Sequence, residues 1–216
     1  MSKKYEIFLF DLDGTITDSA LGITNSVMYA LRKFGIEETD WTKLYKFIGP
    51  PLTESFEKFY GFTKEQSLNG VNYYREYYHD KGIYENRVYD GLEEVLKKIN
   101  EAGKQAIVAT SKPEKYAKII IDHFHLTQYF ACVAGMEMDG GRGTKAQVIT
   151  YALEKNDITD KSKVLMIGDR EHDVIGAHEN GLDCLGILYG FGSRKEFEEA
   201  GADYIREKVE DILQFV

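Results

Sequence analysis

Short apolar runs alternate with helical patterns over most of the chain. The run at residues 5–10 is followed by a turn signal at Asp13-Gly14, which is typical of a buried strand that ends in a loop. Further runs of this kind occur at 105–109, 130–134, 163–167 and 183–187. Segments with helical periodicity, such as 113–124 and 144–154, lie between them. Strands that alternate with helices predict βαβ units, so we expect an α/β fold with a Rossmann-like, doubly wound parallel sheet.

The stretch at about 18–88 differs, because its apolar positions follow helical spacing and show no strand pattern. The candidate helices there are 19–33, 41–47, 52–59 and 64–80. This insert begins just after the first strand, and open α/β sheets bind ligands at the carboxyl ends of their strands. We therefore expect an all-helical cap domain that acts as a lid. The predicted domains are a catalytic core of residues 1–16 and 87–216 and a helical cap of residues 17–86.

Four tyrosines crowd together near the end of this insert, at positions 73, 74, 77 and 78. Aromatic rings at helical spacing most often pack one helix on another. They could also stack on a ring of a substrate, so the sequence leaves both uses open.

Composition narrows the function classes. Hydrophobic residues make up 43% of the 216 positions and charged residues 29%, which is typical of a globular protein and not of a disordered one. The formal charge of −9 argues against a partner that is a nucleic acid polymer, but not against a small anionic substrate held by a few local cations. No apolar run approaches the roughly 20 residues of a membrane span. The start of the chain shows no secretory signal, and the two cysteines, Cys132 and Cys184, have no zinc-site spacing, so we expect reduced thiols and a cytoplasmic location.

Two carboxylates, Asp11 and Asp13, directly follow the first predicted strand. At the exit of a buried strand they are costly unless they are paired or bound to a cation. Mg²⁺ prefers such oxygen ligands and often takes only one or two carboxylates. An Asp-rich turn that caps the next helix is the alternative.

Two further predicted strands also end in polar residues. Thr110-Ser111-Lys112 offers hydroxyl groups and backbone amides that suit a phosphate, although Pro113 also fits a simple helix start. Gly168-Asp169 follows another strand, with Asp173 four residues on. These two acids could hold a cation between them or could favour a helix N-terminus.

The glycine-rich segment from Gly140 to Lys145 matches neither a Walker A loop nor a dinucleotide-binding fingerprint. Lys145 at a helix start opposes the helix dipole, which indicates an anionic ligand, although a solvated lysine is the alternative. In a doubly wound sheet all of these motifs meet at one edge. The edge would then hold a nucleophile, a neighbouring acid or base, a hydroxyl group, a cation and a metal-binding carboxylate.

With these motifs the chain resembles the haloacid dehalogenase-like (HAD) superfamily, in the helical-cap branch that includes phosphoglycolate phosphatase-like and nucleotidase-like proteins. The first family motif corresponds to Asp11-Leu12-Asp13-Gly14-Thr15, and the others correspond to Thr110, Lys145, and Gly168-Asp169 with Asp173. Two positions depart from common family patterns: Lys145 lacks a following proline, and Arg170 stands where a small hydroxyl residue is frequent. The roles of Arg170 and His172 are therefore left open.

The resemblance implies a role for each matched residue. Asp11 would attack phosphorus, Asp13 would act as general acid and then base, and Thr110 and Lys145 would hold the phosphoryl oxygens. The implied metal is Mg²⁺, and its ligands would be Asp11, Asp13, Asp169 and Asp173. Contact with substrate is expected from Thr15, Gly49, Ser111 and Lys112.

The implied function is a Mg²⁺-dependent phosphatase that hydrolyses a small phosphate monoester through an aspartyl-phosphate. Phosphoglycolate and a nucleoside monophosphate are the substrates that the family suggests. A phosphomutase on the same scaffold and a non-catalytic, phosphate-binding regulatory protein are the alternatives. The expected partner is a small phosphorylated metabolite, with no membrane, and the choice between monomer and homodimer stays open.

Overall fold

The computed structural model describes residues 4–138 and 141–216, and the chain forms two compact units. The core unit contains the residues up to Thr17 and from Val88 onward, and the helical unit contains Asp18–Arg87. The chain passes between them through β2 (Thr17–Asp18) and β3 (Arg87–Val88), which pair as a two-stranded sheet.

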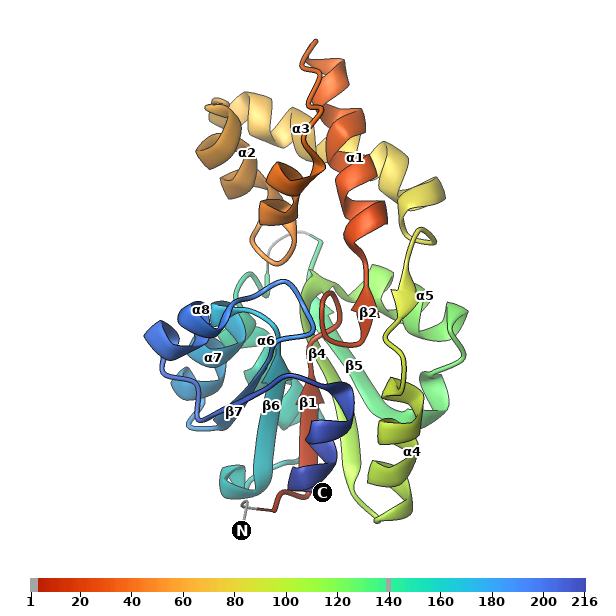
Figure 1. Ribbon diagram of the computed structural model, residues 1–216, viewed down its shortest axis with the longest axis vertical. Helices are drawn as coiled ribbons and strands as arrows, with labels where there is room; N and C mark the ends of the chain where they lie inside the picture. The colour runs from red at the N-terminus through yellow and green to blue at the C-terminus, as the bar shows by residue number, and fades with distance from the viewer. Residues whose placement is uncertain (1–3, 139–140) are drawn as a thin grey trace. The chain divides into compact units, whose positions relative to one another are not determined.

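A six-stranded parallel sheet forms the centre of the core unit (Figure 1). Its strand order is β5-β4-β1-β6-β7-β8. The strands are β1 (Ile7–Phe10), β4 (Gln105–Pro113), β5 (Phe130–Met136), β6 (Val164–Gly168), β7 (Asp183–Ile187) and β8 (Tyr204–Arg206). Leu9 of β1 lies between Ile107 and Met166, and all three side chains are fully buried. Burial on both faces explains why these strands read as continuous apolar runs.

Helices cover both faces of this sheet (Figure 1). On one face α6 (Lys145–Lys155) packs on α7 (Glu171–Glu179), with α8 (Arg194–Ala200) beside it. The other elements of the core unit are α4 (Leu92–Glu101), α5 (Glu114–His123) and three 3₁₀ helices at Thr127–Tyr129, Lys161–Lys163 and Val209–Phe215. The expected doubly wound α/β fold is thus confirmed. β8 is not among the predicted strands, because three half-buried residues make no clear apolar run.

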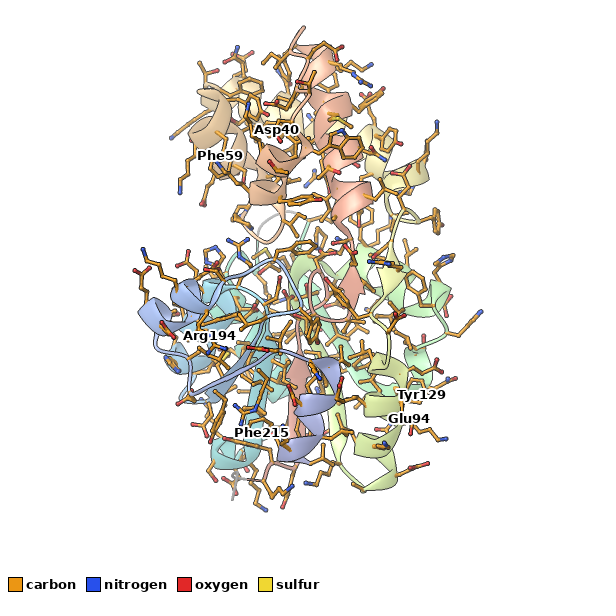
Figure 2. The ribbon with its side chains drawn as sticks, in the orientation of Figure 1. Asp40, Phe59, Glu94, Tyr129, Arg194 and Phe215 are labelled. Carbon is orange, nitrogen blue, oxygen red and sulfur yellow. The ribbon has the colours of Figure 1, made fainter. Side chains whose placement is uncertain are left out.

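The two ends of the described chain contact each other at the amino-terminal edge of the sheet. Tyr5 donates a hydrogen bond to Asp183 and lies 6.2 Å, ring to ring, from Phe215 of the last 3₁₀ helix, which Figure 2 labels. Burial, followed by the hydrogen bond to Asp183, raises the pKa of Tyr5 well above its ordinary value. Lys4 Nζ also donates to the Val216 carbonyl at 2.6 Å. These contacts hold the edge of the sheet that lies opposite the polar strand ends.

The helical unit contains α1 (Ala20–Lys33), a 3₁₀ helix (Trp41–Phe47), α2 (Leu52–Tyr60), α3 (Lys64–Tyr77) and a π-helical turn (Tyr78–Gly82). Asp40, labelled in Figure 2, accepts a hydrogen bond from Thr42 N at 3.0 Å and so begins the 3₁₀ helix. The core of the unit is aromatic, with Phe56 5.1 Å from Phe47 and 5.5 Å from Phe62. The predicted helix at 64–80 ends earlier than expected, since the chain widens into the π-helical turn at Tyr78.

The clustered tyrosines of this unit pack inside it. Tyr74 and Tyr78 are buried and stack with their rings 5.2 Å apart. Tyr73 packs edge-on against Phe34, and Tyr77 donates to Glu85 at 2.9 Å. Packing is therefore the role that the structure gives them.

Across residues 4–138 and 141–216, no helix combines the length and hydrophobicity that a membrane span requires.

The close approach of α1 to the π-helical turn depends on Gly22. A Cβ atom there would lie 1.9 Å from the Gly82 carbonyl oxygen, and both partners are backbone. We expect Gly22→Ala to lower the free energy of unfolding by about 1–3 kcal/mol, as overpacking does. Urea unfolding followed by the fluorescence of Trp41, the single tryptophan, would measure it. Leu21→Ala, at a half-exposed neighbour, is the control and should change stability by less than about 0.5 kcal/mol. Equal effects of both substitutions would contradict the steric argument.

Candidate active site

The polar motifs meet at the carboxyl edge of the core sheet. Asp11 directly follows β1, Thr110 lies near the end of β4, and Asp169 directly follows β6. These three strands are neighbours, with β1 in the middle. After β1 the chain continues to β4 on one side of β1, and it later returns to β6 on the other side. The site therefore lies at the point where the strand order reverses. Open α/β sheets bind ligands at such a point.

Three carboxylates form a buried cluster at this edge. Asp11, Asp169 and Asp173 are at most 6% exposed, and each offers an oxygen within 4.8 Å of the other two. Asp169 Oδ2 accepts a hydrogen bond from Phe191 N at 2.8 Å, while its Oδ1 is buried with no hydrogen-bond partner in the described part of the chain. Burial, and then the charges of Asp11 and Asp173, raises the pKa of Asp169 well above its ordinary value. Such a group is costly unless a cation approaches it.

Lys145 inserts its ammonium group into this cluster. Its Nζ lies 2.7 Å from Asp11 Oδ1 and 2.8 Å from Asp173 Oδ1, and it donates to the Ala109 carbonyl at 3.0 Å. Burial alone would lower the pKa of Lys145, but the two carboxylates outweigh burial and raise it. Burial raises the pKa of Asp173 to about 6, and Lys145 limits that rise. The lysine at the start of α6 is therefore not a solvated side chain, since its charge faces the acids.

A second lysine neutralises Asp13. Lys112 Nζ lies 2.6 Å from Asp13 Oδ2, and the backbone N–H of Lys112 donates to Thr110 Oγ1 at 3.1 Å. Thr110 is 1% exposed and Lys112 is 8% exposed. The ion pair thus joins the end of β4 to the residues that follow β1, and the hydrogen bond shapes the end of β4 itself.

The charges of the site do not balance by themselves. Two lysines, Lys112 and Lys145, face four carboxylates, so two negative charges remain when all the acids are ionised. A divalent cation would supply the missing charge. The donors are all carboxylate oxygens, which suit a hard cation, and the unsatisfied Asp169 Oδ1 is available to one.

Glycines let the backbone approach these acids closely. A Cβ atom on Gly14, where φ is +85°, would lie 2.0 Å from Asp169 Oδ2. A Cβ atom on Gly168 would lie 2.1 Å from the Asp173 carboxyl carbon. Gly14, which has a positive φ, and Gly168, the last residue of β6, therefore let the backbone lie against the carboxylates in their present positions.

Comparison with known proteins identifies this arrangement. The family model for haloacid dehalogenase-like hydrolases matches residues 8–187, which include every strand that ends at the site. The chain belongs to the haloacid dehalogenase-like hydrolase family. A 5′-nucleotidase of Pseudomonas aeruginosa is 45% identical over 193 residues, which cover 89% of this chain and 87% of that protein. The chain is thus a HAD-family phosphatase, as its motifs predict.

Two other relatives are similar to most of this chain. The crystal structure of a predicted phosphatase from Clostridium acetobutylicum has a TM-score of 0.94 and 47% identity, and the match covers 98% of each chain. The tyrosine-protein kinase PtkA of Mycobacterium tuberculosis is 36% identical over 188 residues, which cover 87% of this chain and 63% of the kinase.

The core unit brings together most of the residues that the HAD resemblance selects. Asp11, Asp13, Thr110, Lys112, Lys145, Asp169 and Asp173 make the contacts described above. Thr15 is fully buried, and its Oγ1 has no hydrogen-bond partner in the described chain, while Ser111 is half-buried. Gly49 belongs to the helical unit, where its φ is +103°. Gly140 lies outside the described residues.

Arg170 and His172 take positions beside the acids rather than among them. Arg170 donates from its backbone N–H to Asp173 Oδ2 at 3.1 Å, and its Nε donates to Glu196 Oε1 at 2.8 Å. It therefore links the start of α7 to α8 and orients Asp173. His172 is half-buried in the first turn of α7.

Sequence reasoning missed the loop after β7, Tyr189–Gly192, which closes over Asp169. Phe191 N donates to Asp169, and Tyr189 Oη donates to the Thr15 carbonyl at 3.0 Å. A Cβ atom on Gly190 would lie 2.4 Å from the Gly14 carbonyl oxygen, so the two loops touch through backbone. The available signal was the pair of glycines, Gly190 and Gly192, directly after a predicted strand.

Loss of the buried ammonium tests this electrostatic balance. We expect Lys145→Met to lower the free energy of unfolding by about 3–5 kcal/mol in metal-free buffer, because it leaves buried carboxylates without their cation. Chemical denaturation at pH 7 measures the change. The exposed Lys161 provides the control, and Lys161→Met should shift stability by less than about 0.5 kcal/mol. A Lys145 variant as stable as this control would show that the charges do not interact as described.

Proposed function

We propose that this HAD phosphatase hydrolyses a small phosphate monoester with the help of Mg²⁺ and through a phosphorylated Asp11. The observation that carries the proposal is the position of Asp11, which is buried, 2.7 Å from the Lys145 ammonium and within the acidic cluster of Asp169 and Asp173. A carboxylate in this setting is oriented by a cation on one side. Lys145 contacts Oδ1, so Oδ2 would be the oxygen that attacks phosphorus.

In the first half of the reaction, an oxygen of Asp11 forms a bond to phosphorus while the bond from phosphorus to the ester oxygen breaks. Asp13 transfers a proton to the departing ester oxygen, so the leaving group departs as an alcohol. Lys145 lies near Asp11 and can stabilise the negative charge on the phosphoryl oxygens. The Thr110 hydroxyl accepts from Lys112 N and keeps its own proton to donate to the same oxygens.

In the second half, the Asp13 carboxylate removes a proton from water, and the water oxygen attacks phosphorus. The bond between phosphorus and Asp11 breaks, which releases inorganic phosphate, restores the Asp11 carboxylate and leaves Asp13 protonated for the next cycle. Lys112, 2.6 Å from Asp13, holds the Asp13 side chain in position for this step. One acid thus serves both halves because its proton leaves with the alcohol and is replaced from water.

Mg²⁺ would be held by Asp11 and Asp169, with the Asp13 carbonyl and Asp173 completing the set. When bound, it supplies positive charge that lets an anionic phosphate approach an anionic nucleophile. Support comes from the two uncompensated negative charges and from the buried, unsatisfied Asp169 Oδ1.

The proposed partner is a small phosphorylated metabolite. Relatives carry the names 5′-nucleotidase, at 45% identity, and phosphoglycolate phosphatase, at 22% identity, so a nucleoside monophosphate and phosphoglycolate are the two candidates. We propose that the helical unit is a cap that selects between them and that Gly49 contacts the substrate. The free thiols of Cys132 and Cys184 support the proposed cytoplasmic location.

A second candidate is transfer of the phosphoryl group from Asp11 to an alcohol other than water. The similarity to the tyrosine-protein kinase PtkA favours keeping it. Product analysis distinguishes the two, because hydrolysis yields inorganic phosphate in step with substrate loss, whereas transfer yields a new phosphate ester.

Asp11→Asn tests the nucleophile. We expect Mg²⁺-dependent phosphate release from p-nitrophenyl phosphate, phosphoglycolate and nucleoside monophosphates to fall to background, because an amide cannot form the phosphoryl bond. Asp122→Asn removes an exposed carboxylate of the same unit and should keep full activity. Turnover that survives the loss of Asp11 would refute the proposed mechanism.

Thermal unfolding tests the metal site without relying on activity. At a Mg²⁺ concentration about 100 times the Kd, the melting temperature should rise by about 5–10 °C. Asp169→Asn should remove this rise. NaCl at the same ionic strength is the control for general screening of charge. A variant that gains as much from Mg²⁺ as the original protein would place the ion elsewhere.

A further inference from the structure

The first turn of α7 carries Asp173, but the residue before this helix cannot cap it. Arg170 stands at the N-cap position, and an arginine side chain has donors only. The first N–H groups of a helix need an acceptor, which Ser, Thr, Asn or Asp supplies at most helix starts. Asp173 itself accepts from Arg170 N at 3.1 Å, so the N–H of Glu171 still needs an acceptor from another part of the chain.

Glu196 of α8 supplies this acceptor. Its Oε1 accepts one hydrogen bond from Glu171 N and another from Arg170 Nε, each at 2.8 Å. The side chains of Arg170 and Glu196 are both only 18% exposed, so little water competes for these bonds. One carboxylate oxygen thus caps α7 and also pairs with the arginine that stands where a local cap would be.

The hydrophobic core fixes the position of Glu196. The next residue, Phe197, is fully buried in the apolar cluster that α6 and α7 also help to form. A Cβ atom on Gly186 of β7 would lie 2.6 Å from Cδ1 of the Phe197 ring, so α8 packs directly on this strand. Ser193 Oγ accepts from Glu196 N at 3.2 Å at the start of α8, beside Arg194, which Figure 2 labels. The carboxylate that caps α7 is therefore held by packing and by a helix cap of its own.

The cap acts on the acidic cluster through the first turn of α7. Asp173 lies two residues after Glu171, and its Oδ1 is 2.8 Å from Lys145 Nζ. The same ammonium lies 2.7 Å from Asp11 Oδ1. Asp173 also belongs to the buried cluster with Asp11 and Asp169. A shift of this turn would therefore move a proposed Mg²⁺ ligand together with the lysine that orients the nucleophile.

We infer that Glu196 is a positioning residue for the reaction, because it caps α7 from a neighbouring helix and so holds Asp173 in place at the proposed Mg²⁺ site. Glu196 touches neither the substrate nor the metal and acts only through Glu171 and Arg170. Replacing a residue that orients a metal ligand typically costs about 10- to 100-fold in metal affinity or activity. The inference rests on the proposed Mg²⁺-dependent function, to which it adds a residue from α8.

Hydrogen exchange in metal-free buffer tests the cap by itself. Glu196→Ala should speed exchange of the Glu171 amide by about 10-fold or more, because this N–H loses its charged acceptor. Glu196→Gln keeps an acceptor oxygen and should keep most of the protection. Glu199→Ala removes an exposed glutamate of the same helix and should change nothing. Exchange at Glu171 that is equally slow in Glu196→Ala and in the original protein would overturn the inference.

Calorimetric titration with Mg²⁺ in the absence of substrate tests the positioning of Asp173. Glu196→Ala should raise the Kd for Mg²⁺ by about 10- to 100-fold, and Glu199→Ala should leave it unchanged. The Mg²⁺ concentration for half-maximal phosphate release should rise in parallel, while KM for the ester at saturating Mg²⁺ stays the same. A merely structural role would lower the melting temperature of the metal-free protein without changing this Kd, and that result would refute the positioning role.

A substitution at the N-cap position provides a rescue. A serine at position 170 can accept from an N–H of the first turn through its own hydroxyl group, so Arg170→Ser creates the local cap that the chain lacks. Glu196→Ala combined with Arg170→Ser should therefore recover most of the Mg²⁺ affinity that Glu196→Ala alone loses. If the serine restores none of it, Glu196 does not act as a cap and the inference fails.

The outcomes separate the two proposals. If the original protein and Glu196→Ala bind Mg²⁺ with the same Kd, the proposed function stands and the positioning role of Glu196 fails. If the original protein neither binds Mg²⁺ nor needs it for phosphate release, the proposed metal-dependent function fails and the positioning role fails with it. Hydrogen exchange at Glu171 still decides in that case whether Glu196 caps α7.

Discussion

The site depends on a buried ammonium group held between carboxylates. Lys145 lies within 2.8 Å of both Asp11 and Asp173, and without it three acids would be buried together without the ammonium group that contacts two of them. The attraction is strong because little water screens these charges, and burial of the acids is costly for the same reason. The lysine therefore lets the fold place acids together, yet it leaves enough negative charge to attract a divalent cation.

The parallel sheet makes this concentration of charge possible. Every strand points its carboxyl end the same way, so polar residues that follow β1, β4 and β6 arrive at one edge although they are far apart in sequence. The apolar strands before these residues are buried on both faces. Their pairing fixes the positions of the polar residues relative to one another. The hydrophobic core thus makes the active site rigid. The polar residues occupy only the positions at the end of each strand or directly after it.

The sequence predicts this edge well because its signals are local. An apolar run that ends in Asp or Thr indicates a buried strand and also a polar residue at its carboxyl end, as at Asp11 and Asp169. Features that join distant segments could not be predicted in this way. The loop at Tyr189–Gly192 reaches Asp169 through a backbone N–H, and its two glycines indicate a turn without indicating which residue the turn contacts. A pocket in the helical unit that Leu21, Trp41 and Tyr84 line joins three segments, none of which shows a motif. The tyrosines at 73–78, which did stand out, pack inside their own unit.

The glycines around the acids also constrain how such an enzyme can change. Side chains at Gly14 and Gly168 would overlap the carboxylates of Asp169 and Asp173, which would have to move. Small substitutions there cannot adjust reactivity in gradual steps, since the first added carbon already displaces a carboxylate. By contrast, Trp41 and Tyr84 of the helical unit are 42% and 51% exposed, and substitutions at exposed positions usually change stability little. Drift in the sequence of such a chain can therefore remodel the surface of its helical unit long before it alters its chemistry.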